Sequence, residues 1–362
     1  MKHFGILTSL IGLMPVSTKR RILLRRYGQN PKIWGEVYLK DEIDKNCKLF
    51  FSPDELKDKL LMKNVQKDIV DCYILYGTIP NEYFMFDFFH KRDKVYRQSC
   101  LSVMRKDQMC LALRNSNEAL RQMTDKGLFY TLTAKFFKRD VLVLKEAMDK
   151  EKFLSFYSRH NNFIVKPLNG QCGVGTFISK TYNDAYKTFY QLLGISVGGV
   201  ILEELIHQSQ ETATFNESSV NTVRLPSIYN RDGQTILQPF FRTGRKGQVV
   251  DNGGSGGIFA VIDPGTGKLI TDGYDELGHH YKEHPDSHIT YKGWQIPRWQ
   301  ELINLSNKIH KSLLPINKYI GFDFALTDDG WVLVEGNWGQ FLGQYATGIG
   351  IKKEFEQLIK KS

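Results

Sequence analysis

Two carboxylates and a carboxamide near the end of the chain have the residue types of a metal site: Asp323, Glu335 and Asn337. They flank Thr327-Asp328-Asp329-Gly330, and Asp-Gly between two apolar runs is a strong signal for a β-hairpin turn. Such a hairpin places Asp323 within one residue of Glu335, and Asn337 shares a strand face with Glu335. Buried like charges are costly unless a cation lies between them, and these oxygen ligands suit Mg²⁺ or Mn²⁺. We therefore predict a metal site; the alternative is a surface hairpin with unrelated acids.

The turn allows two registers for this hairpin. One places Leu326 opposite Trp331 and Asp323 opposite Val334, whereas the other places Asp323 opposite Gly336. Either register keeps the two acids within one residue of each other, so the prediction does not depend on the choice.

A lysine followed by a glycine-rich loop is the second candidate site. Within Phe163 to Ile178, an apolar strand ends at Lys166, and a loop with Gly170, Gly173 and Gly175 leads to another apolar strand. Glycines let backbone N–H groups approach phosphate oxygens, and the lysine adds a positive charge. The loop is not a P-loop, because no Gly-Lys-Ser/Thr ends it and a strand follows. Phosphate binding and an ordinary glycine-rich hairpin are equal alternatives for this loop alone.

Two further strands carry charged residues. Val200 to Ile206 ends in Glu203 and Glu204, which suits either an adenine and ribose pocket or a buried strand with a polar end. Asn221 to Ile228 is an apolar strand that contains Arg224. A buried guanidinium needs an anionic partner, which is a phosphate, a substrate carboxylate or a structural acid.

The elements that position these residues follow from apolar spacing and from capping and turn signals. Ser52-Pro53-Asp54-Glu55 begins a helix that we expect to continue to Tyr73 and to end at Gly77 and Pro80. Beyond the strands already named, we expect the strands Val141–Leu144, Phe240–Gly244 and Ile258–Ile262 and the helices Ser116–Met123, Phe153–Arg159, Asn183–Leu193, Pro297–Leu314 and Phe355–Lys361.

Composition is that of an ordinary globular protein, with 41% hydrophobic and 24% charged residues in a chain of 362. The first thirty residues hold six lysines and arginines and no acid, so they supply six of the ten net positive charges. An anionic membrane surface is the partner this favours, whereas no recognition motif favours nucleic acid. The run Phe4 to Val16 is too short to span a bilayer, and we expect a structural or a membrane-surface helix there. Five scattered cysteines favour a reducing compartment.

Four histidines lie close together in the sequence: His279, His280, His284 and His288. Their spacing fits no helical zinc-binding pair, and no cysteine is near. We expect a surface or substrate-facing loop rather than a metal site.

Taken in chain order, these motifs resemble the ATP-grasp superfamily. The motifs are Asp125-Lys126, Ile164-Val165-Lys166-Pro167 with its glycine loop, Leu202-Glu203-Glu204-Leu205, Asn221-Thr222-Val223-Arg224, and Asp323 with Glu335-Gly336-Asn337. Other details resemble the sugar-transfer-associated branch found in surface-polysaccharide gene clusters: Asp251-Asn252 with its glycine run, His284-Pro285-Asp286, Ile296-Pro297-Arg298-Trp299 and Ile320-Gly321-Phe322-Asp323.

The resemblance implies an α+β fold with ATP held between two lobes, each built on an antiparallel sheet, after a helical N-terminal region. We expect the boundaries 1–120 for the helical region, 121–204 for the small lobe and 205–362 for the large lobe. In the implied site, Lys126 and Lys166 contact the nucleotide phosphates, and the loop Gly170 to Gly175 covers them. Adenine and ribose are lined by Glu203, Glu204, Leu205 and Ile206. Mg²⁺ is held by Asp323, Glu335 and Asn337, and the transferred phosphate faces Asn221 and Arg224.

The activity implied is ATP-dependent joining of a carboxylate to an amine through an acyl phosphate, in the synthesis or modification of a surface polysaccharide. The carboxylate would belong to an acidic sugar or an amino acid. A sugar or small-molecule kinase on the same scaffold needs the same ATP residues and is the alternative. A non-catalytic binding module is disfavoured, because the expected ligands are all present. We expect a cytoplasmic protein and leave open a peripheral contact between residues 1–26 and the inner face of the membrane.

Overall fold

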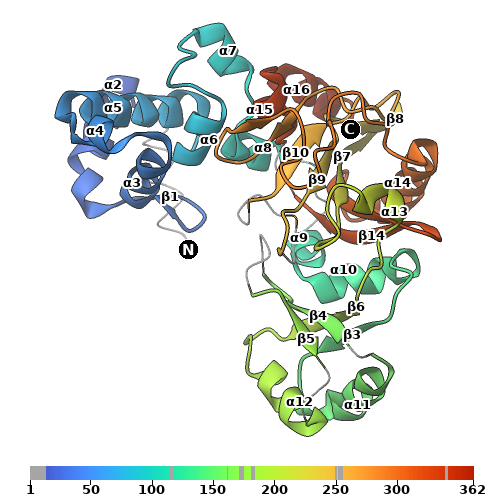
Figure 1. Ribbon diagram of the computed structural model, residues 1–362. Coiled ribbons are helices and arrows are strands. Elements are labelled where there is room, and N and C mark those ends of the chain that lie inside the picture. Colours follow the sequence, from blue (N-terminus) through green and yellow to red (C-terminus); the bar gives the residue numbers. More distant parts are fainter. Residues whose placement is uncertain are drawn as a thin grey trace. The chain divides into compact units, whose positions relative to one another are not determined.

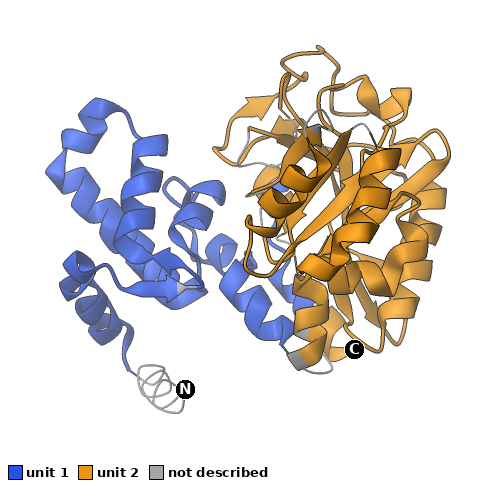
Figure 2. Ribbon diagram, turned by 90° about the horizontal axis from the view of Figure 1, so that it is seen from below, with its two compact units in different colours: residues 1–111, 347–357 blue, residues 112–346, 358–362 orange. Residues whose placement is uncertain are grey.

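The computed structural model describes residues 14–111, 113, 117–160, 162–170, 175–180, 184–248, 251, 256–338 and 341–362. The chain forms two compact units, residues 1–111 with 347–357 and residues 112–346 with 358–362, which we call unit 1 and unit 2 (Figure 2). The apolar run from Phe4, expected to form a helix, lies almost wholly outside the described residues. No helix in the described part of the chain is both long and apolar enough to cross a membrane.

The described part of unit 1 is helical apart from one two-stranded ribbon, as expected for the N-terminal region. Its elements are α2 (Val16–Arg25), η1 (Tyr27–Gln29), β1 (Lys32–Trp34), β2 (Val37–Tyr38), α3 (Leu39–Phe50), α4 (Pro53–Lys57), α5 (Lys59–Tyr76), α6 (Pro80–Met85), α7 (Lys94–Ser99), α8 (Val103–Cys110) and, late in the chain, most of α16 (Lys352–Lys360).

The helix predicted to run unbroken from Ser52 is interrupted, so that part of the prediction is wrong. Asp58 ends α4 and caps α5, because its carboxylate accepts hydrogen bonds from two backbone N–H groups of the next turn, at 2.9 and 3.0 Å. The predicted start is confirmed, since Ser52 and Glu55 form a reciprocal capping box. The predicted end is also confirmed, since Gly77 closes α5 with φ 71°.

A partly buried ion pair lies in unit 1. Arg97 on α7 donates to both carboxylate oxygens of Asp68 on α5, at 2.9 and 2.8 Å, and the Tyr83 hydroxyl donates to the same carboxylate at 2.8 Å. Two fully buried rings contact the pair: Tyr83 through its hydroxyl, and Phe88, whose ring centroid lies 5.2 Å from Cζ of Arg97. The Arg97 guanidinium is therefore matched by a carboxylate, as the burial of its charge requires.

Unit 2 contains two antiparallel sheets and the helices that cover them (Figure 1). Its elements are α9 (Asn117–Thr124), α10 (Lys126–Thr133), η2 (Ala134–Phe136), β3 (Val141–Leu144), η3 (Ala147–Asp149), α11 (Lys150–Arg159), β4 (Asn162–Pro167), β5 (Phe177–Lys180), α12 (Ala185–Leu193), β6 (Val200–Glu204), α13 (Gln210–Ala213), β7 (Thr222–Asn230), β8 (Gly233–Ile236), β9 (Phe240–Thr243), β10 (Ile258–Val261), β11 (Gly273–Tyr274), β12 (His280–Tyr281), α14 (Trp299–Leu313), β13 (Tyr319–Thr327), β14 (Gly330–Asn337) and α15 (Gly343–Thr347).

The small sheet has the strand order β3-β6-β4-β5. Helices α11 and α12 cover one face, and their Phe153 and Phe189 are buried in one cluster with Phe163 and Val165 of β4 (Figure 1). Apolar burial on that face thus fixes β4 in place, and Lys166 lies near the end of this strand.

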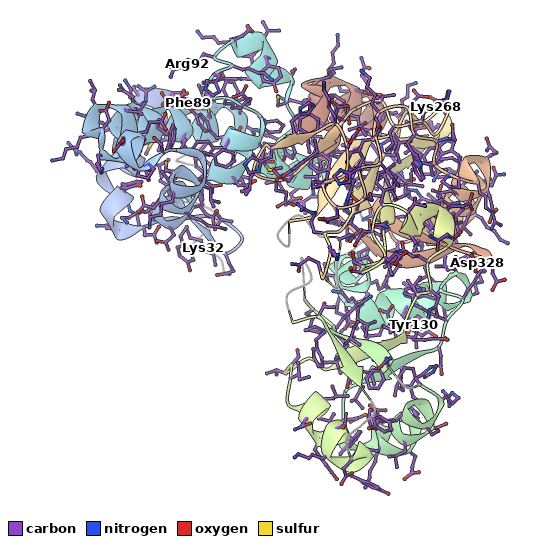
Figure 3. The ribbon with its side chains drawn as sticks, viewed as in Figure 1. Lys32, Phe89, Arg92, Tyr130, Lys268 and Asp328 are labelled. Carbon is purple, nitrogen blue, oxygen red and sulfur yellow. The ribbon has the colours of Figure 1, made fainter. Side chains whose placement is uncertain are left out.

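The large sheet has the order β12-β11-β10-β9-β7-β13-β14, with β8 paired to β7. Helix α14 packs Leu302 and Ile309 into one core cluster with Phe322 and Trp331 of the hairpin. The hairpin turn at Asp328 is exposed (Figure 3). The predicted hairpin and the predicted helix before it are both confirmed.

A β-bulge settles the register of the hairpin. Leu326 pairs with Trp331, yet Asp323 pairs with Glu335, because the ladder passes from Leu333 directly to Glu335. Val334 is the extra residue, so neither of the two regular registers describes the whole hairpin. The bulge places the two acids directly opposite each other.

Candidate active site

The three predicted metal ligands lie together on the hairpin. Asp323 on β13 faces Glu335 on β14, and Asn337 donates from Nδ2 to Glu335 Oε1 at 3.0 Å. Asp323 is only 1% exposed, whereas Glu335 and Asn337 are half-buried. The oxygen donors therefore extend from the core of the large sheet toward the surface.

Two arginines from neighbouring strands flank Asp323. Arg224 on β7 donates from Nε to Oδ1 and from Nη2 to Oδ2, the second at 2.7 Å, and Arg242 Nη2 on β9 lies 3.0 Å from Oδ2. Burial alone would raise the pKa of Asp323, but the two guanidinium charges outweigh burial and lower it. The carboxylate is therefore ionised at neutral pH, as a metal ligand must be.

Arg242 extends this network to Thr222 and Asp251. Its guanidinium donates to Thr222 Oγ1 at 2.8 and 3.0 Å and lies 3.5 Å from Asp251 Oδ2, and the Thr222 hydroxyl donates to Asp251. Burial raises the pKa of Asp251, against the opposing charge of Arg242. Sequence reasoning assigned no role to Arg242, because only the sheet order shows that β9 lies beside β7.

Glu203 on β6 is held between two cations of the small sheet. Lys166 Nζ lies 2.8 Å from Oε1, and Arg139 contacts Oε2 through Nη2 and, at 2.9 Å, through Nε. The Glu203 and Arg139 side chains are 3% and 4% exposed. Burial alone would raise the pKa of Glu203, but Lys166 and Arg139 outweigh burial and lower it to about 2.

Arg139 also reaches the large sheet. Its Nη1 donates to the Leu333 carbonyl at 2.7 Å and its Nη2 to the Val334 carbonyl at 3.4 Å. These are the carbonyls of the bulge, so one side chain connects Glu203 to the strand that carries Glu335. Sequence reasoning missed Arg139, because Lys138-Arg139-Asp140 has the pattern of an ordinary surface charge run.

Lys126 begins α10, where Asp125 caps the helix by accepting from the next two N–H groups, of Gly127 and Leu128, at 2.8 and 3.0 Å. The ammonium group of Lys126 donates to the Gly170 carbonyl at the start of the glycine loop. Burial lowers the pKa of Lys126, while Glu335 opposes this and Lys166 adds to it. The two predicted phosphate lysines and the predicted metal strand are thus within electrostatic range of one another.

A glycine allows α10 to approach the metal strand. A Cβ on Gly336 would lie 2.4 Å from Cζ of Phe129, which is buried on α10. Only a residue without a side chain fits between Glu335 and Asn337 at this contact. The Glu-Gly-Asn order therefore has a packing reason as well as a chemical one.

A family model described as sugar-transfer associated ATP-grasp matches residues 106–360. The chain belongs to this family. The match confirms the predicted family and the α+β ATP-grasp fold with its two antiparallel sheets.

Solved structures similar to this ATP-grasp chain include three ligases. The D-alanine–D-alanine ligase of Bacillus anthracis is 14% identical, with 69% of this chain and 70% of that chain covered and a TM-score of 0.42. The corresponding ligase of Helicobacter pylori is 15% identical, with 69% and 64% covered and a TM-score of 0.44. The ATP-grasp ligase PsnB, solved with Mg and ADP, is 15% identical, with 77% and 70% covered and a TM-score of 0.39. No curated protein matches the chain.

The remaining predicted nucleotide residues of this ATP-grasp chain lie at the end of β6 and in the glycine loop after β4. Glu204 accepts from the Asp140 backbone N–H at 3.0 Å, and Leu205 and Ile206 follow the strand, half-buried. Gly175 has φ 75°, and a Cβ there would lie 2.9 Å from Pro167 Cγ, so the loop needs glycine at this position. Gly173 lies outside the described residues.

Asn221 is placed differently from the other predicted residues. Its Nδ2 donates to the Thr212 and Asn216 carbonyls at 2.8 and 2.9 Å, and its Oδ1 accepts from the Gly244 N–H at 3.3 Å. The residue is fully buried. These contacts give the carboxamide a role in holding two loops beside β7, and its contact with a phosphate stays a prediction.

The donor set fits a hard cation. Glu335 offers one oxygen beyond its bond to Asn337, the Asn337 carbonyl oxygen is of a suitable type, and each Asp323 oxygen has a second lone pair beside its arginine partners. No group of three or more His, Cys, Asp or Glu residues suited to a metal occurs among the described residues. In the histidine loop, His279 and His280 pair with Asp275 and Asp272 at 2.8 and 2.7 Å instead.

Proposed function

We propose that this chain is an ATP-dependent carboxylate–amine ligase that works through an acyl phosphate. The observation that carries the proposal is the convergence of Lys126 and Lys166 with Glu335 and Asn337, from three separate chain segments of unit 2. Two lysines suit the phosphates of ATP, and the oxygen donors suit the cation that accompanies them.

In the proposed site, Lys126 and Lys166 bind the phosphates, and the loop Gly170 to Gly175 covers them. Binding of phosphate would draw the two ammonium groups away from their present acceptors, the Gly170 carbonyl and Glu203. Arg139 would then keep the Glu203 carboxylate paired, so the exchange leaves no buried charge without a partner. Glu203, Glu204, Leu205 and Ile206 would line adenine and ribose.

Asp323, Glu335 and Asn337 would hold Mg²⁺, or Mn²⁺ in its place. The cation would neutralise charge on the phosphate oxygens during transfer. Arg224 would face the transferred phosphate while its bidentate contact with Asp323 fixes the guanidinium in place. Asn221 would act beside it.

The reaction has two steps. A substrate carboxylate oxygen attacks the γ-phosphorus of ATP, the bond to the β-phosphate oxygen breaks, and ADP leaves. A neutral amine then attacks the acyl carbon, phosphate leaves with the carboxylate oxygen, and the amine loses one proton. The protein's part is positioning and charge neutralisation, which two lysines and Arg224 supply.

We propose that one substrate is a surface polysaccharide or its precursor. It is joined to an amino acid at the cytoplasmic face. The family description and the basic N-terminus support this. Within residues 1–26, Arg20 is already paired with Asp71, at 2.6 Å through Nη2, so the exposed Arg21, Arg25 and Arg26 would make any peripheral membrane contact. No nucleic-acid partner is proposed.

A screen of acidic sugars against amino acids for ADP release tests the proposal. With the substrate carboxylate labelled with heavy oxygen, a ligase transfers one labelled atom into phosphate. A stable phosphorylated product without label in phosphate would instead establish the kinase. No ADP release with any pair of substrates would contradict both.

A further inference from the structure

A hollow with a volume of about 550 Å³ lies within unit 1. Its wall is formed by the end of α5, by α7 and by the first turns of α16, and all of these lining residues belong to unit 1. None of its residues belongs to the site in unit 2, so what it binds can be argued separately from the ligase reaction.

Three lysines line this hollow: Lys94, Lys352 and Lys353. In the described part of the chain none of the three has an acidic partner, whereas the neighbouring Arg97 is fully paired with Asp68. One carboxylate, Glu356, also lines the hollow, which leaves a net charge of +2 from three lysines and one acid. Unpaired like charges on one concave surface attract an anion.

The position of two of these lysines adds to the argument. Lys352 and Lys353 are the first residues of α16, where the helix dipole is positive and disfavours cations, and Glu354 is the one acid in this first turn. These two lysines repel each other and the third lysine, Lys94. A bound anion would compensate for this repulsion, which explains why lysines occupy the unfavourable end of the helix.

The other lining residues indicate what carries the anionic group. Tyr76 supplies a half-buried aromatic ring, and Gln98 and Glu356 supply amide and carboxylate groups that can bond to hydroxyls. The volume is that of a small-molecule site rather than of a bare ion. We infer that this hollow binds an acidic sugar, with its phosphate or carboxylate on the lysines and its hydroxyls on Gln98 and Glu356.

Binding to the full-length chain tests the inference, with glucose 6-phosphate, glucuronic acid, glucose and inorganic phosphate as probes in calorimetric titrations. The test variant is the triple substitution Lys94→Gln, Lys352→Gln and Lys353→Gln. The matched control is Lys59→Gln, Lys63→Gln and Lys67→Gln, which removes three exposed lysines of α5 and the same net charge.

We expect both acidic sugars to bind at least about tenfold more tightly than glucose or phosphate. The test variant should lose at least about tenfold of this affinity, while the control variant keeps it and both keep the wild-type melting temperature. Equal affinity for glucose and glucuronic acid, or for phosphate and glucose 6-phosphate, would overturn the assignment to an acidic sugar. Unchanged affinity in the test variant would overturn the location. ADP release reports on unit 2, so the two proposals fail independently.

Discussion

Glu203 on the small sheet and Asp323 on the large sheet are both buried acids with two basic partners, yet their surroundings differ. Glu203 has one oxygen on Lys166 and the other on Arg139. Asp323 also has two cationic partners, but it faces a second acid, Glu335, across the ladder. Glu203, which contacts only cations, therefore holds Lys166 and Arg139 in position. Asp323 and Glu335, which face each other, can share a further cation between them.

This comparison makes Glu335 the most sensitive position. We expect Glu335→Gln to lower ADP release at least about a hundredfold, because one charged ligand of the cation is lost while the strand keeps its shape. The matched control is Asp329→Asn, which removes an exposed acid at the turn of the same hairpin. Both variants should keep the wild-type melting temperature. Wild-type turnover in Glu335→Gln would remove this residue as a ligand.

The contacts of Arg139 with Glu203 and with the bulge carbonyls should contribute to the free energy of unfolding. Arg139→Met leaves the buried Glu203 carboxylate without its second cation and two bulge carbonyls without a donor, so unfolding free energy should fall by about 3–5 kcal/mol. Arg159→Met breaks a half-exposed ion pair with Asp140 and should cost less than about 1 kcal/mol. Urea unfolding measures both. Equal losses in the two variants would mean that Arg139 does not connect the sheets.

Acid should weaken the Glu203 network selectively. Its folded-state pKa of about 2 lies below the ordinary value of 4.5, so its stabilising contribution is complete above about pH 4.5 and is lost as the pH falls toward 2. The unfolding free energies of wild type and Glu203→Gln should therefore converge by about 3 kcal/mol between about pH 5 and pH 2. A constant difference in unfolding free energy between the two proteins over this range would show that Lys166 and Arg139 do not stabilise the Glu203 carboxylate.

The smallest effect is expected where the two regions pack together. Gly336→Ala places a methyl group against the Phe129 ring and should destabilise the protein by about 1–3 kcal/mol. Because the displaced helix α10 carries Lys126, KM for ATP should rise as well. Adding Phe129→Leu should recover part of both losses. No recovery in the double variant would mean that the ring is not what the methyl group meets.

The residue types and their order along the chain were sufficient for the local elements and for most of the candidate site. The hairpin turn, the strand before the glycine loop and the capped helix start all follow from interactions within a few residues, which a sequence displays directly. The break at Asp58 escaped prediction, because the apolar periodicity continues through it and only the side-chain cap divides the helix.

What the tertiary structure alone decided are contacts between residues far apart in the chain. The bulge at Val334, which sets Asp323 opposite Glu335, depends on the whole ladder rather than on the turn. Arg139 and Arg242 become part of the site only through the sheet orders that bring them to Glu203 and Asp323. A charged residue shows its partner in a sequence only when the partner is near along the chain. The pairings that hold this site span 64 residues between Arg139 and Glu203 and 99 between Arg224 and Asp323.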